Sequence, residues 1–336
     1  MKRFLLVLLL GLVFAMSACT TSEEDSGEVT VYSSLFPQYD VVRALAGDYV
    51  NNEFLLSSGV DAHSYEPSPR TVADIFESDA LIYTNAAMEP WISTFIEEHD
   101  NYGYTLLNIS SNIETIGHDD DHDDAHDDDH DEAHDTHDTH DDDHDDAHDD
   151  DHDDHDHGDY DPHVWTSPQN MVQITRDIEA LLLELVPEHS DVISQNADEY
   201  VESLNELDSA FHDTVESTEL DSIMLGGHNA LGYFTEAYGL ELINPYRGFS
   251  TDSEPTSQAI GEMIDTMKAN EIEHLFSEHL IYPDVADIIS EETGAEILYL
   301  YNGANLGTDD FDSGMGMIDI FEHNLEKVRI GLGYSE

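Results

Sequence analysis

Cysteine and basic residues are scarce in this sequence. Its 336 residues contain one cysteine, Cys19, and only 9 lysines and arginines against 77 aspartates and glutamates. A single cysteine excludes an internal disulfide, so no part of the fold is cross-linked. The net charge of −68 repels nucleic acid and membrane phosphates, so nucleic acid is not an expected partner.

The acidity is not confined to one segment. Residues 118–157 contain 23 of the 77 acids, which leaves 54 acids against 9 bases in the rest of the chain. Such a surface repels itself unless salt screens it, which indicates a protein that works at high ionic strength. We favour a halophilic source, with an ordinary acidic surface protein as the alternative.

Long hydrophobic runs are missing except for a short one at the start. The run in "MKRFLLVLLLGLVFAMSAC" is shorter than the roughly 20 apolar residues that a bilayer crossing needs. Residues 1–19 are therefore expected to be an export signal peptide. The ending "MSAC" resembles the lipobox of bacterial lipoproteins, with Met16 in place of the usual leucine. This resemblance implies a lipid on Cys19 that anchors the protein to the membrane outside the cytoplasm; a free cysteine is the alternative.

The pattern that follows predicts an α/β protein. Residues 20–28 are polar and turn-rich and predict a flexible tether. From there on, predicted strands alternate with helices, which favours parallel sheets covered by helices on both faces. Residues 187–217 contain no glycine and no internal proline and predict a rigid helix about 45 Å long. The length suits two lobes, placed at residues 29–186 and 218–336 and linked by this helix.

Nine of the 21 histidines lie outside residues 118–157, and three of these are expected at the ends of strands. They are His63 in "GVDAHSYEPSPR", His163 in "DYDPHVWTSP" and His228 in "LGGHNALGYF". In wound α/β folds, ligands bind in the crevice outside the carboxyl ends of the strands. Three neutral imidazoles there suit Zn²⁺, which prefers nitrogen and sulfur ligands in tetrahedral geometry. Any one of them alone is more often an ordinary surface or core residue.

At these residues the chain resembles the metal-specific solute-binding lipoproteins of ABC importers, the zinc and manganese uptake family. The resemblance covers the chain from Val29 onward and is carried by "GVDAHSYEPSP", "DPHVW", "HNALGYFTEAYGL" and "FSEH". It implies two α/β lobes joined by one rigid helix, with the metal in the cleft between them. His63 and His163 match the two ligands of the first lobe, and His228 matches the first ligand of the second lobe.

The third ligand position favours zinc over manganese. The manganese-type branch looks different there, because it has a glutamate and adds an aspartate near the end of the last strand. This chain has His228 where the manganese-type branch has the glutamate. Near the end of the last strand it has Asn302 and Asn305 but no carboxylate, so hard Mn²⁺ would lack the oxygen ligands it prefers. The fourth ligand stays open between water, Glu278 of "FSEH" and a residue from the acidic segment.

Residues 118–157 combine carboxylates with regularly spaced histidines. Spacings of three and four would place these histidines on one helical face, but the repelling aspartates predict a solvated, disordered loop without metal. We interpret the loop as a low-affinity zinc trap beside the cleft, with an acidic spacer as the alternative; the zinc branch of the family often has such a loop here. Its histidines are His118, His122, His126, His130, His134, His137, His140, His144, His148, His152, His155 and His157.

Three classes of function are compatible with these features. The first is a monomeric protein that binds zinc tightly at one site and delivers it to a membrane permease with its ATPase. The second is a zinc hydrolase, although the chain has no HExxH motif and no evident general base beside the histidines. The third is a metal buffer or adhesin without a transport role. The lipid anchor favours the first class, and a neighbouring operon for a permease would separate it from the third.

Overall fold

The computed structural model describes residues 29–117, 160–246, 248–249, 254–280 and 284–334. The predicted signal peptide with Cys19, the tether and the zinc-trap loop lie outside these residues. None of the described helices is long and apolar enough to cross a membrane.

The first half of the chain forms a sheet of four parallel strands in the order β2-β1-β3-β4. The strands are β1 (Thr30–Ser33), β2 (Asn51–Phe54), β3 (Ala80–Tyr83) and β4 (Thr105–Asn108). Helices α2 (Phe36–Ala46), α3 (Pro69–Phe76) and α4 (Ile92–Tyr102) connect them. All four residues of β3 are buried, as expected for a central strand covered on both faces.

The second half repeats this topology. Strands β5 (Ser222–Met224) and β6 (Glu241–Ile243) pair in parallel, as do β7 (His274–Glu278) and β8 (Glu296–Leu300). A parallel bridge between Leu225 and Phe276 joins the two pairs. The resulting order, β6-β5-β7-β8, equals that of the first sheet. The helices here are α7 (Gly232–Tyr238), α8 (Ser257–Ala269), α9 (Asp284–Thr293), α10 (Thr308–Ser313) and α11 (Met317–Gly331).

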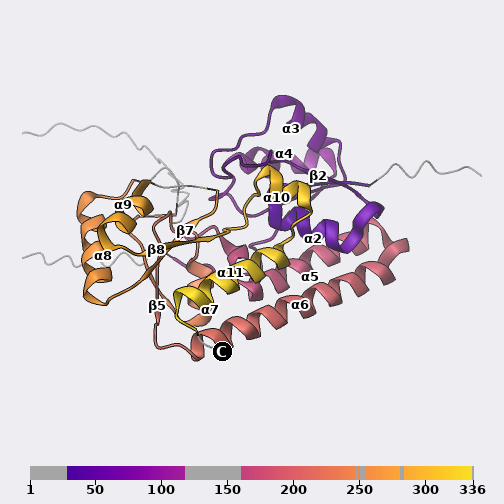
Figure 1. Ribbon diagram of the computed structural model, residues 1–336. Coiled ribbons are helices and arrows are strands. Elements are labelled where there is room, and N and C mark those ends of the chain that lie inside the picture. The colour runs from indigo at the N-terminus through magenta and orange to yellow at the C-terminus, as the bar shows by residue number, and fades with distance from the viewer. Residues whose placement is uncertain (1–28, 118–159, 247, 250–253, 281–283, 335–336) are drawn as a thin grey trace, which may run out of the picture.

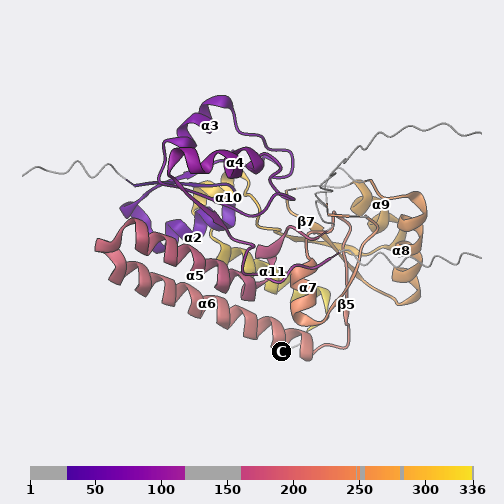
Figure 2. The ribbon, with the colours of Figure 1, turned by 180° about the vertical axis from the view of Figure 1, so that it is seen from behind.

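Two helices in the middle of the chain pack along each other. They are α5 (Pro168–Leu185) and α6 (Ser190–Glu216), separated by a short 3-10 turn, η3 (Pro187–His189). The 27 residues of α6 make a rod about 40 Å long. Figures 1 and 2 show α6 running beneath both halves, and it contacts α2 in the first half and α7 and α11 in the second.

Three apolar clusters hold the layers together. The outer face of the first sheet packs on α3 and α4 around Ile75 and Phe95, and the outer face of the second packs on α8 and α9 around Met263 and Ile289. The largest cluster is continuous through both halves, from β1 across α6 to α11. The two lobes therefore share one core along their inner faces.

A late segment of the chain, residues 301–316, crosses back to the first half; we call it the crossover segment. The backbone N–H of Phe36 donates to the Ala304 carbonyl at 3.0 Å, and the N–H of Gly59 donates to the Leu306 carbonyl at 2.8 Å. The ring of Phe311 stacks on Tyr39 at 5.7 Å between centroids. Figure 1 accordingly shows α10 beside α2, far from α8 and α9.

Most of the predicted elements are present, including the α/β alternation and the long central helix. The helix begins at Ser190, because residues 187–189 form the 3-10 turn. Three elements that the sequence analysis did not predict are α4, β4 and α10. Helix α4 ends at Tyr102 and is capped by Gly103, whose φ of 75° favours glycine, so its stop signal was present in the sequence.

Candidate metal centre

His163 is held by the aspartate two residues before it. Asp161 Oδ1 accepts hydrogen bonds from the His163 backbone N–H at 2.9 Å and from the ring Nδ1 at 2.8 Å. Both side chains are buried, and the next residues form a 3-10 turn, η2 (Val164–Thr166). Because the carboxylate accepts at Nδ1, Nδ1 carries the proton and Nε2 presents its lone pair.

His228 is held in the same way by a residue from a neighbouring strand. Its Nδ1 donates to Oε1 of Glu278, the last residue of β7, and the other oxygen of Glu278 accepts from Asn302 Nδ2 at 2.7 Å. The residue before the histidine is Gly227, where a Cβ atom would lie 2.9 Å from Glu278 Oε1. The glycine therefore makes room for the carboxylate that orients the ring.

His63 lies in a loop of the first half. Its backbone N–H donates to Asp61 Oδ1 at 2.9 Å, the same turn that precedes His163. The crossover segment ties this loop down, because Asn305 Nδ2 donates to the carbonyls of Ser57 at 2.9 Å and Val60 at 2.8 Å. The position of His63 thus depends on contacts from the second half of the chain.

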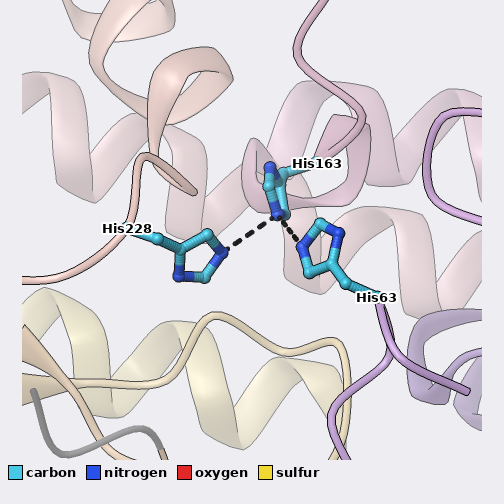
Figure 3. A group of neighbouring side chains, drawn as sticks. All are labelled: His63, His163 and His228. Carbon is cyan, nitrogen blue, oxygen red and sulfur yellow. Dashed lines mark hydrogen bonds between the residues drawn. The ribbon is translucent and has the colours of Figure 1, made fainter. Parts of the chain in front are cut away.

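The three imidazoles point their Nε2 atoms at one another (Figure 3). The distances from His163 Nε2 are 3.1 Å to His63 Nε2 and 3.3 Å to His228 Nε2, and the three possible ligand atoms all lie within 4.8 Å of one another. Ligand nitrogens at about 2.05 Å from a tetrahedral Zn²⁺ lie about 3.3 Å apart, so the spacing suits this ion. The three rings line a cavity of about 220 Å³ together with Asn302 and Asn305.

The surroundings of two rings shift their pKa values in opposite directions. Burial, together with the neighbouring His163 and His228, lowers the pKa of His63 from 6.5 to about 2. Burial also acts to lower the pKa of His228, but the charge and hydrogen bond of Glu278 outweigh it and raise this pKa above 6.5. Protons therefore do not compete with metal at His63 at physiological pH, whereas at His228 they compete up to a higher pH than at a free imidazole.

The structure brings together the three histidines singled out in the sequence, but not all at strand ends. His228 follows β5 closely, whereas His63 lies nine residues beyond β2. The expectation is wrong for His163, which precedes η2 and follows no strand of either sheet. Its place is set by Asp161, which the sequence analysis did not single out. The signal was the shared pattern of an aspartate two residues before the histidine, in "DAH" and "DPH".

Glu278 and the two asparagines named from the sequence border the histidines. Glu278 contacts Nδ1 of His228, on the other side of the ring from Nε2. The side-chain amide of Asn302 donates to Glu278, and the backbone carbonyl of Asn302 accepts a hydrogen bond from Trp165 Nε1 at 2.8 Å. Asn305 is buried and binds the His63 loop. Residues around all three histidines are therefore joined through the crossover segment.

Comparison with known proteins identifies the family of the chain. A model of the family ZnuA, described as zinc-uptake complex component A, periplasmic, matches residues 31–330. The chain belongs to the ZnuA family. This membership confirms the resemblance seen in the sequence, and the family is one of zinc-uptake components rather than of enzymes.

Among ZnuA relatives, the zinc-binding lipoprotein AdcA of Streptococcus pneumoniae is 25% identical over 335 residues, which cover 98% of this chain and 61% of the relative. The chain thus spans less than two thirds of that relative. The high-affinity zinc uptake system protein ZnuA of Bacillus subtilis is 26% identical over 313 residues, with 93% of this chain and 90% of the relative covered.

A solved structure supports the architecture. The Zn(II)-bound ZnuA-like domain of the same pneumococcal protein superposes with a TM-score of 0.70 at 24% identity, covering 91% of this chain and 99% of that chain. This likeness confirms the predicted two-lobe α/β fold.

Proposed function

We propose that the chain captures Zn²⁺ outside the cytoplasm and delivers it to the membrane permease of an ABC transporter, which an ATPase drives. The observation that carries this proposal is the convergence of three imidazole Nε2 atoms at the spacing of a tetrahedral zinc site. The names of the pneumococcal and Bacillus relatives, which refer to zinc binding and zinc uptake, support it.

His63, His163 and His228 are the proposed ligands. All three offer a nitrogen ligand, and carboxylates accept hydrogen bonds from Nδ1 of two of the rings. This combination suits zinc better than Mn²⁺. The alternative is that the chain is a manganese-type protein and binds Mn²⁺ at this site. The fourth position is open to water, to Glu278 or to the zinc-trap loop. Glu278 would have to turn from Nδ1 of His228 toward the three Nε2 atoms to fill it.

Substitution of the ligands tests the site. His63→Ala, His163→Ala and His228→Ala should each lower the tight-site affinity for zinc by orders of magnitude, because each removes one of three strong ligands. The control is His212→Ala, on α6 away from the site, which should leave the affinity unchanged. Chelator-competition titration measures this, and wild-type affinity in any of the three variants would rule out the assignment.

The zinc-trap loop is proposed to raise the local zinc concentration beside the cleft. Deleting residues 118–157 should remove weak, multiple binding events in calorimetry and leave one tight site. The deletion should slow uptake by cells only when zinc is scarce. If the tight site is lost as well, the fourth ligand comes from the loop.

Delivery and anchoring are tested in cells. Lipidation at Cys19 should hold a monomeric chain at the membrane, and Cys19→Ala should release it into the soluble fraction. Cells that lack the permease should take up no more zinc when the chain is supplied. Unchanged zinc uptake in cells without the chain would favour the alternative of a metal buffer or adhesin.

A further inference from the structure

A second cavity lies on the other side of the Asp161–His163 pair. Its volume is about 410 Å³, and none of its lining residues lines the cavity of the three histidines. Residues of α7 form one part of it, and Gly117, which is bridged to Tyr160, forms another. The cavity thus lies where residues 118–159 leave and rejoin the described fold.

Two buried oxygen atoms at this cavity have no hydrogen-bond partner in the described chain. One is Asp161 Oδ2, on a side chain with 0% exposure, and the other is Oδ1 of Asn229. Asp161 therefore uses its two oxygens differently, since Oδ1 accepts both hydrogen bonds from His163 while Oδ2 accepts none. A buried carboxylate oxygen without a partner is costly, so such an atom indicates a missing ligand.

The backbone of α7 is shaped to admit this carboxylate. A Cβ atom at Gly232 would lie 2.2 Å from Asp161 Oδ2, so any side chain there would push the carboxylate away. Only glycine allows Oδ2 to remain at this place in the cavity wall.

The charge around the cavity indicates a cation. No lysine or arginine is among the described residues that line it, and the exposed Glu236 adds a second carboxylate. Among the described residues, the one ion-pair contact of Asp161 is with His163 and is made through Oδ1, so no cationic side chain contacts Oδ2. A water molecule would satisfy a hydrogen bond but not the charge. Carboxylate and amide oxygens are the ligands that hard divalent cations prefer.

We propose that this cavity binds a hard divalent cation through Asp161 Oδ2 and Asn229 Oδ1. The cation would draw negative charge away from the carboxylate that supports His163, so it would weaken zinc binding at the three histidines. This coupling rests on the proposed zinc site, whereas the cation site itself does not.

Localisation of Mn²⁺ tests the site itself. Crystals of the zinc-loaded mature chain are soaked in Mn²⁺, and anomalous differences are recorded at an energy that separates manganese from zinc. We expect a manganese peak at about 2.2 Å from both oxygens. The peak should vanish in Asn229→Ala and persist in Asn229→Asp, which keeps an oxygen and adds charge. A water molecule, an empty cavity, or a peak that survives Asn229→Ala would overturn the proposal.

Zinc titration with and without Ca²⁺ at constant ionic strength tests the coupling, because three imidazoles bind Ca²⁺ poorly. Saturating Ca²⁺ should weaken zinc binding at least about fivefold in the wild-type chain and leave Asn229→Ala unaffected. Equal effects in both would refute the coupling. A failure of the zinc site would show as absent tight zinc binding even without Ca²⁺, and so would be distinguishable.

Discussion

For two of the three imidazoles, a single carboxylate decides which ring nitrogen is free to bind metal. Asp161 and Glu278 accept at Nδ1 of His163 and His228, and this leaves both Nε2 atoms facing His63 or one another. The spacing of Asp161 two residues before His163 is a signal that the sequence contains, whereas Glu278 could not be assigned to His228 from the sequence. Glu278 is fifty residues from His228, and only the packing of β7 beside β5 brings the two together.

Loss of the carboxylate behind His163 should weaken zinc binding. Asp161→Ala is expected to lower zinc affinity about 10-fold to 100-fold, because the ring loses the acceptor that fixes its tautomer and orientation. Asp161→Asn keeps an acceptor oxygen and should cost less. Chelator-competition titration measures both against Asp48→Ala, an exposed control. Equal affinities for Asp161→Ala and Asp48→Ala would show that the hydrogen bond does not matter.

The dependence of zinc binding on pH should follow His228. The pKa of His228 is raised above 6.5, so protons compete with zinc for this ring up to a higher pH than for a free imidazole. Below the pKa of His228, zinc affinity should fall about tenfold per pH unit. His63, with a pKa of about 2, should add no proton competition in this range. Glu278→Gln should move the onset to lower pH. An onset unchanged by this substitution would argue against His228 as the competing group.

At the scale of elements, the crossover segment connects the sequence-distant parts of the site. Its Asn305 donates two hydrogen bonds to the His63 loop, and Asn302 reaches Glu278. Helix and strand patterns predicted most of the regular elements, though not α4, β4 and α10, because apolar periodicity and glycine stops are local signals. The path of residues 301–316 back to the first half could not be predicted, because contacts such as Phe311 on Tyr39 join residues that are far apart in the sequence.

Removal of the Asn305 side chain should loosen the His63 loop. Asn305→Ala leaves two carbonyls without donors, so we expect a loss of about 1 to 3 kcal/mol in the free energy of unfolding and a weaker zinc affinity. Denaturant unfolding and zinc titration measure the two effects. Asn205→Ala, at an exposed position of α6, serves as the control. If Asn305→Ala keeps full zinc affinity, the crossover segment does not position His63.

For the whole molecule, the shared core limits how far the lobes can move. The largest apolar cluster runs through both halves, and α6 contacts helices of each. Opening the lobes widely would expose part of this core to water, at about 25 cal/mol per Å² of apolar surface. Small movements of loops and helices, such as the His63 loop, remain available without that cost.

Zinc should therefore change the distance between the outer helices very little. Spin labels at Arg70→Cys on α3 and Lys268→Cys on α8, in a chain with Cys19 replaced by alanine, should show a shift of no more than about 2 Å between zinc-free and zinc-loaded protein. Pulsed electron paramagnetic resonance measures this distance. A shift several times larger would mean that the lobes close about a hinge.

The proposed zinc site consists of three imidazoles, those of His63, His163 and His228. X-ray absorption at the zinc edge, on the chain loaded with one equivalent of zinc, identifies the atoms bound to the ion. We expect three imidazole nitrogens at about 2.0 to 2.1 Å, with at most one further light-atom ligand. A first shell made mainly of oxygen, or one with fewer than three imidazoles, would contradict it.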